Sequence, residues 1–168
     1  LPLIALNARG SFRDAESLLD KCIQFTSEDK LITLKEVKDL LGVVDVGQLS
    51  TFVDYLVAKN AKGAISHINN MLEEGTDLQE FVKTLVFYLR QCLLVKIDAD
   101  FFDVQSSGLS EEELAHLKNQ SSELSQKNIQ QMLELFIEAE NNMKYASIVQ
   151  LPLELAIIEA AIPLLPHQ

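Results

Sequence analysis

The sequence predicts an all-α protein, and three observations support this prediction. Glycine and proline number only 6 and 4 among 168 residues, so few positions interrupt regular structure. Apolar side chains recur every three to four residues, a spacing that places them on one face of a helix. Ser, Thr, Asp or Asn precedes most of these periodic segments, as N-cap residues do. No alternating pattern or hairpin dipeptide predicts a strand.

The first predicted helix follows Ser11, a candidate N-cap, with Asp14 three positions later as in a capping box. Arg13 lies in the first turn, nearly opposite the apolar face on the helical wheel. The apolar positions that we expect to be buried are Ala15, Leu18, Leu19, Cys22 and Ile23. Free backbone N–H groups already make this end of the helix positive, so a cation is unfavourable there unless an anion approaches.

Two interpretations of Arg13 are open from the residues alone. It is a solvated surface arginine, paired with Glu16 or Asp20, at a cost of a few tenths of a kcal/mol to the helix. Alternatively, its planar guanidinium and the neighbouring N–H groups form a binding site for phosphate.

The following helices have equally clear boundaries. A Thr33–Glu36 capping box begins a second helix that ends at Gly42, and a third includes residues 49–57. Asn60 caps a fourth, which ends near Gly75. The fourth helix is expected to bury Ala64, Ile65, Ile68 and Leu72. Asp77 begins the longest helix, residues 78–97, whose far end is apolar nearly all round.

The last third of the chain begins with a predicted long loop, DADFFDVQSSGLS, residues 98–110. Ser110 and Glu113 form a capping box for a short helix, and Ser125 begins a longer one with Phe136 and Ile137 on its apolar face. Pro152 lies near the start of a final apolar helix through residue 162. The Met and Phe side chains follow the apolar stripes and are predicted to lie in the core.

Composition excludes several classes of function. The formal charge of −11 disfavours direct DNA binding, and the acidic balance also argues against a helix-turn-helix at TLKEVKDLLG. Cys22 and Cys92 are far apart and have apolar neighbours, which indicates buried thiols rather than a disulfide or zinc site. His67 and His116 stand alone and are read as surface or packed histidines. No catalytic signature, metal motif or membrane-spanning run is present, so we expect no catalytic residue, metal or membrane contact.

The segment GSFRDAESLLDK, residues 10–21, resembles the GSxRDAxxLLDQ motif of the AAA+ clamp-loader ATPases, in particular the gamma/tau subunits of bacterial DNA polymerase III. In that family the motif is sensor 2 of the lid domain. The resemblance implies that Arg13 contacts the terminal phosphates of ATP, bound with Mg²⁺ by an ATPase core that this chain lacks. Phe12 and Glu16 depart from the usual motif, so the contacts around it are expected to differ.

Later segments resemble the same family. ITLKEVKDLLGVVD is similar to the end of the lid, and both INNMLEEGTDLQEFVKTLVFYLRQCLLVK and AENNMKYASIVQLPLELAIIEAA are similar to its third domain. The resemblance implies a remnant of the AAA+ lid (residues 1–43) followed by a helical collar domain (44–168). It implies a cytoplasmic subunit that assembles with itself and with other clamp-loader subunits to load the sliding clamp during DNA replication. The chain alone is expected to be neither an enzyme nor an ATP-binding protein.

A collar function predicts exposed apolar side chains for subunit contacts, and Phe101, Phe102 and Tyr145 are the candidates. The alternative for these three is an ordinary intradomain core. A different class of function is also open, namely a stand-alone helical adaptor or regulatory protein. The adaptor predicts a start codon close to Leu1, whereas the clamp-loader interpretation predicts that the chain is a piece of a longer protein with an ATPase motif upstream.

Overall fold

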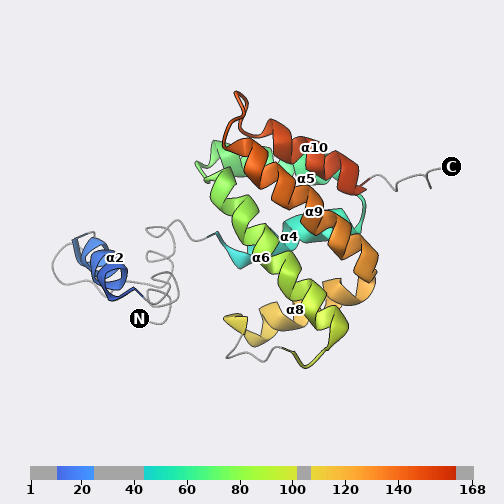
Figure 1. Ribbon diagram of the computed structural model, residues 1–168, viewed down its shortest axis with the longest axis horizontal. Coiled ribbons are helices and arrows are strands. Elements are labelled where there is room, and N and C mark those ends of the chain that lie inside the picture. The colour runs from blue at the N-terminus through green and yellow to red at the C-terminus, as the bar shows by residue number, and fades with distance from the viewer. Residues whose placement is uncertain (1–10, 25–43, 102–106, 162–168) are drawn as a thin grey trace. The chain divides into compact units, whose positions relative to one another are not determined.

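The computed structural model describes residues 11–24, 44–101 and 107–161. Within these ranges the regular structure is entirely helical (Figure 1), which confirms the predicted all-α class. The helices are α2 (Phe12–Gln24), α4 (Val46–Val57), α5 (Ala61–Glu73), α6 (Leu78–Ile97), α8 (Glu111–Glu123), α9 (Gln126–Met143) and α10 (Leu151–Ala161). The chain divides into two compact units, Leu1–Val43 and Val44–Gln168. Their assignment to a lid remnant and a collar stays a prediction.

Side-chain caps begin these helices where the sequence predicts them. The Ser11 hydroxyl accepts a hydrogen bond from the backbone N–H of Asp14 at 3.3 Å, at the start of α2. Ser110 and Glu113 form the complete capping box of α8, because each side chain accepts from the backbone N–H of the other. Asn60, Asp77 and Ser125 cap α5, α6 and α9. Gly75 has φ +85°, the left-handed conformation that commonly ends a helix.

The core of the second unit is built around α6, which packs against α8 and α9 and also contacts α4 and α5. Helix α10 closes the bundle against α9, α5 and α4. Phe52, Phe81 and Phe136, from three of these helices, are fully buried. Phe52 stands edge-on to the other two rings, with centroid distances of 5.3 Å and 6.1 Å. This geometry is the favourable one for aromatic pairs, so the three rings fix α4, α6 and α9 relative to one another.

Several apolar positions that the sequence assigns to the core are exposed. Leu19 and Ile23 of α2, Leu72 of α5, Ile137 of α9 and Phe87 of α6 all belong to this group, and the prediction of burial is wrong for them. Phe12, at the start of α2, is exposed as well. A helix buries only the strip that faces its neighbours, so an apolar stripe wider than this strip leaves its edges in solvent.

Some predictions fall outside the described residues. These are the helix from Thr33 to Gly42, the candidate turn for DNA binding within it, and the end of the last helix at residue 162. Across the three described ranges, no helix combines the length and apolar character needed to cross a membrane.

Candidate subunit interface

Arg13 lies exposed in the first turn of α2, next to the N-cap Ser11. Its backbone carbonyl accepts a hydrogen bond from the Ser17 hydroxyl at 2.9 Å, a contact that leaves the guanidinium unused. Within residues 11–24, Arg13 forms no ion pair, so pairing with Glu16 or Asp20 is not observed there. The side chain is therefore available to an anion at the positive end of the helix, but its role stays a prediction.

The structure does not bring the predicted interface residues together. Phe101 is 52% exposed and lies shortly after the end of α6, whereas Tyr145 is 90% exposed and lies shortly after the end of α9. The side-chain amide of Gln79, in the first turn of α6, donates to the carbonyl of Met143 at 3.4 Å, which places Tyr145 near the beginning of α6. Since 20 residues of helix span about 30 Å, Phe101 and Tyr145 lie at opposite ends of α6. The prediction for Phe102 lies outside the described residues.

A groove of about 490 Å³ runs between α9 and α10, next to Tyr145. Its apolar wall comes from residues on both helices and the turn that joins them: Leu135, Ala139, Ala146, Ile148, Leu151, Pro152, Leu155 and Ala156. Leu155 is 58% exposed, and Ile148 and Leu151 are also exposed. Large apolar side chains gathered in one concave surface are typical of a site that another protein covers.

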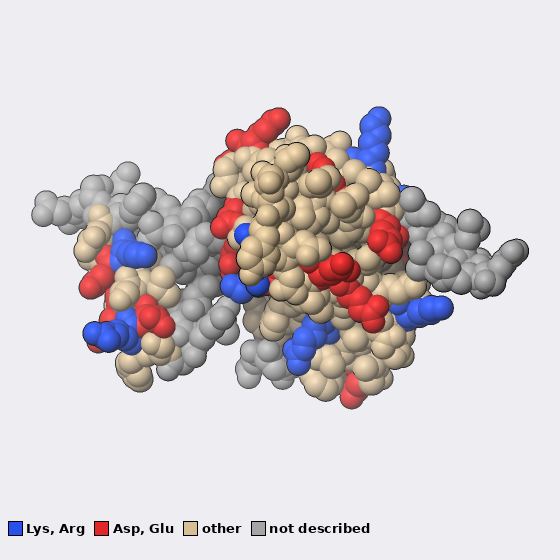
Figure 2. All heavy atoms as spheres, turned by 45° about the horizontal axis from the view of Figure 1, so that its top comes forward, with Lys and Arg blue, Asp and Glu red and all other residues tan. Residues whose placement is uncertain are grey.

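Carboxylates border this groove. Glu138 of α9 and Glu159 of α10 both line it and both are exposed. The α9–α10 groove therefore combines an apolar floor with a negative rim. In the view of Figure 2, the Val44–Gln168 unit presents a wide tan area crossed by acidic side chains, and the basic side chains lie mostly toward its margins.

The sequence contained one signal for this surface that reasoning from the residues missed. The last helix, LPLELAIIEAA, is apolar on nearly all sides. Such a helix is either buried all round or packed against a partner on its outer face. In the structure Leu153 and Ile157 face the core, while Leu155 and Ile158 are exposed. The outer side of α10 therefore leaves apolar side chains uncovered in this chain.

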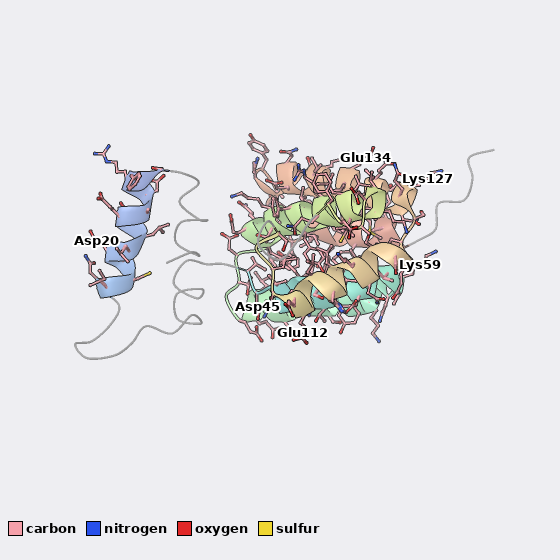
Figure 3. All side chains as sticks on the ribbon, turned by 90° about the horizontal axis from the view of Figure 1, so that it is seen from below. Asp20, Asp45, Lys59, Glu112, Lys127 and Glu134 are labelled. Carbon is pink, nitrogen blue, oxygen red and sulfur yellow. The ribbon has the colours of Figure 1, made fainter. Side chains whose placement is uncertain are left out.

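A second hollow, of about 670 Å³, lies between α4 and α8. Asp45 and Glu112 lie at the same end of these two helices (Figure 3), and both line the hollow. His116 and Asp54 also line the hollow, and His116 Nε2 lies 3.2 Å from an Asp54 carboxylate oxygen. Among the described residues, no group of three or more His, Cys, Asp or Glu is arranged to hold a metal ion.

The polar side chains behind this hollow are paired with one another. The Tyr88 hydroxyl donates to the side-chain oxygen of Gln120 at 2.7 Å, and both residues are buried. The Gln120 amide nitrogen donates to the Asp54 carboxylate at 2.7 Å and to the carbonyl of Ser50 at 2.8 Å. Desolvation by burial raises the pKa of Tyr88 well above its usual value, which keeps the phenol a donor. These contacts join α4, α6 and α8 and give the network a structural role.

The two cysteines and His67 are also packed against other parts of the protein. Cys22 and Cys92 are both free and buried, which confirms the interpretation as buried thiols. Burial raises the pKa of Cys92 to about 12, so this thiol stays protonated at neutral pH. His67 is half-buried and its Nε2 lies 3.1 Å from the carbonyl of Gln48, as expected for a packed histidine.

The helical architecture has a counterpart among solved structures. The DNA clamp loader delta protein of Bacillus subtilis matches with a TM-score of 0.61 over 94% of this chain and 48% of its own, at 16% sequence identity. This likeness shows that the two chains share a helical fold. A family model described as DNA polymerase III subunits gamma and tau domain III matches residues 32–167. The chain belongs to this family, which confirms the predicted resemblance.

Individual relatives agree with this membership. The tau subunit of DNA polymerase III from Bacillus subtilis is 24% identical over 159 residues, which cover 95% of this chain and 27% of tau. The tau subunit of Escherichia coli is 29% identical over 97 residues, which cover 58% and 15%. Protein STICHEL-like 1 of Arabidopsis thaliana is 29% identical over 126 residues, which cover 71% and 11%. The chain thus spans about a quarter or less of each of these relatives.

Proposed function

We propose that this chain is the assembly region of a clamp-loader gamma/tau subunit, and that it joins other clamp-loader subunits during the loading of the sliding clamp in DNA replication. The observation that supports this most strongly is the family match over residues 32–167. The α9–α10 groove supplies an apolar surface suited to a subunit contact. The net charge of −11 favours contacts with proteins over contacts with DNA. A cytoplasmic location follows from this role in replication.

Binding to a partner subunit tests the proposal directly. The 168-residue chain should co-purify with the clamp-loader delta subunit of the same organism and elute with it as one complex in gel filtration. A chain in which Leu155 is changed to Asp should bind more weakly if the groove takes part, and Leu72→Asp is a control at another exposed leucine. No complex at micromolar concentrations of both proteins would contradict the assembly function.

Within the full-length protein, Arg13 is proposed to act as sensor 2 and contact the terminal phosphates of ATP. This proposal rests on the motif resemblance and on the exposed position of Arg13 beside the free N–H groups of α2. The chain alone offers one arginine without the loop and Mg²⁺ ligands that hold a triphosphate, so we expect it neither to bind ATP tightly nor to hydrolyse it.

Substitutions in the full-length protein test the proposed role of Arg13. Arg13→Ala should reduce clamp-stimulated ATP hydrolysis at least about tenfold, because it removes a positive charge at the developing negative charge of the phosphates. Lys21→Ala, at the other end of α2, is the matched control and should retain activity. Equal rates for the two variants would contradict the sensor role. Micromolar binding of ATP to the 168-residue chain in a calorimeter would contradict the expectation for the chain alone.

A further inference from the structure

The proposed assembly function leaves open which surfaces meet, and the charges on two of them complement each other. We infer that the α9–α10 groove of one copy of this chain binds the outer face of α6 of a second copy. The outer face of α6 is defined here as Lys83, Phe87, Arg90 and Leu94. This inference rests on the proposed function and adds to it the two surfaces and their pairing.

The outer face of α6 places an apolar side chain between two cations. Phe87 is 55% exposed, although most of the helix around it is buried. Lys83 and Arg90 stand four residues before and three residues after it, so both flank the ring on the same face of the helix. Leu94 continues the face one turn further and is partly exposed. Lys83 pairs with Glu80 at 3.1 Å in an exposed contact, a type of pair that is worth little and is easily exchanged.

The α9–α10 groove offers the matching features. Its floor is apolar, with Leu151 and Leu155 exposed, and its rim carries Glu138 and Glu159. An aromatic ring placed in the groove would be desolvated by the two leucines, while the flanking cations would meet the rim carboxylates. Aromatic anchors in apolar pockets with charged surroundings are the usual centres of protein interfaces.

Charge also selects this pairing over the other possible ones. Two grooves facing each other would bring four carboxylates together, and like charges at an interface cost several kcal/mol. Leu72, another exposed apolar residue, has no cation to meet the acidic rim, because the residues three and four positions from it are Ile68, Asn69, Gly75 and Thr76. Among the exposed large apolar residues of the described helices, only Phe87 has both a lysine and an arginine three or four positions away, on its own face of the helix.

A contact between two different surfaces is heterologous. Each copy that joins leaves one free groove and one free outer face of α6 at the two ends of the assembly. Such assemblies grow until the rotation between copies closes a ring. The wild-type chain is therefore expected to form oligomers larger than a dimer as its concentration rises.

Complementation between two variants tests the pairing. Leu155→Asp damages only the groove, and Phe87→Asp damages only the outer face of α6. Each variant alone should be monomeric in sedimentation velocity, because losing a central anchor raises the dissociation constant by about thirtyfold or more. Mixed in equal amounts, the two variants retain one intact groove and one intact face, and they should form a heterodimer that grows no further. Leu72→Asp should assemble like the wild type, and far-UV circular dichroism confirms that each variant is folded.

Charge reversal provides an independent measurement. Arg90→Glu and Glu159→Lys should each weaken assembly about tenfold or more at low salt, and the chain that carries both changes should recover most of the loss. A wild-type chain that stays monomeric at about 100 µM would overturn the inference, as would variants that assemble normally or that fail to form the heterodimer. A monomeric chain that still co-purifies with the delta subunit would refute this pairing alone, whereas failure of both assays would refute the proposed function.

Discussion

The buried hydrogen bond between Tyr88 and Gln120 allows the stability of the second unit to be tested quantitatively. Tyr88→Phe removes the hydroxyl that donates to the Gln120 side-chain oxygen at 2.7 Å. Gln120 is only 1% exposed, so water cannot easily replace this donor. Leaving a buried acceptor without a partner costs about 1–3 kcal/mol. We therefore expect the free energy of unfolding to fall by about 2 kcal/mol, which lowers the melting temperature by about 6–8 °C for a unit of this size.

A double-mutant cycle in urea, followed by far-UV circular dichroism, measures this coupling. The variants are Tyr88→Phe, Gln120→Met and the double substitution. In the double variant neither buried polar atom of the pair remains, so its destabilisation should be smaller than the sum of the single effects by about 1–2 kcal/mol. Tyr145→Phe is the control, because this hydroxyl is in solvent and its loss should cost less than about 0.5 kcal/mol. Additivity within about 0.3 kcal/mol would refute the reasoning.

Two further predictions concern alkaline pH and helix capping. Burial raises the pKa of Cys92 from 9.0 to about 12, so the folded protein retains a proton that the unfolded chain loses. The stability from this group is fully present below pH 9 and is lost as the pH rises toward 12. In urea denaturation, the free energy of unfolding should therefore decline less steeply with pH in Cys92→Ala than in the wild type. Identical slopes would contradict the assignment. Asp77→Ala removes the side chain that accepts from the N–H groups of Gln79 and Glu80, and should destabilise by about 1 kcal/mol in the same assay. Asp77→Asn keeps an accepting oxygen and should cost much less; equal losses for the two substitutions would show that the cap is unimportant.

The arrangement of the functional surfaces could be predicted from the sequence only in part. The motif around Arg13 identified a family, and the helical wheel placed this side chain opposite the apolar stripe, where the structure finds it exposed. For Tyr145 the sequence left an exposed contact residue and a core residue both open; the structure leaves the side chain exposed, and the groove beside it was not foreseen. Leu151 and Ile148 follow each other closely in the sequence, yet their joint surface exists only because α10 folds back onto α9.

The helical class, the positions of the caps and the family of this protein could all be predicted from local sequence patterns. Capping and periodicity depend on residues within four positions of one another, so Ser110 and Glu113 specify the start of α8 without reference to the rest of the chain. Which apolar side chains are covered depends instead on how the helices pack. Phe136 and Ile137 are neighbours with similar hydrophobicity, and the direction of the packed helices buries the first and leaves the second in solvent. Burial depends on distant segments, because a side chain is removed from water only by what packs against it.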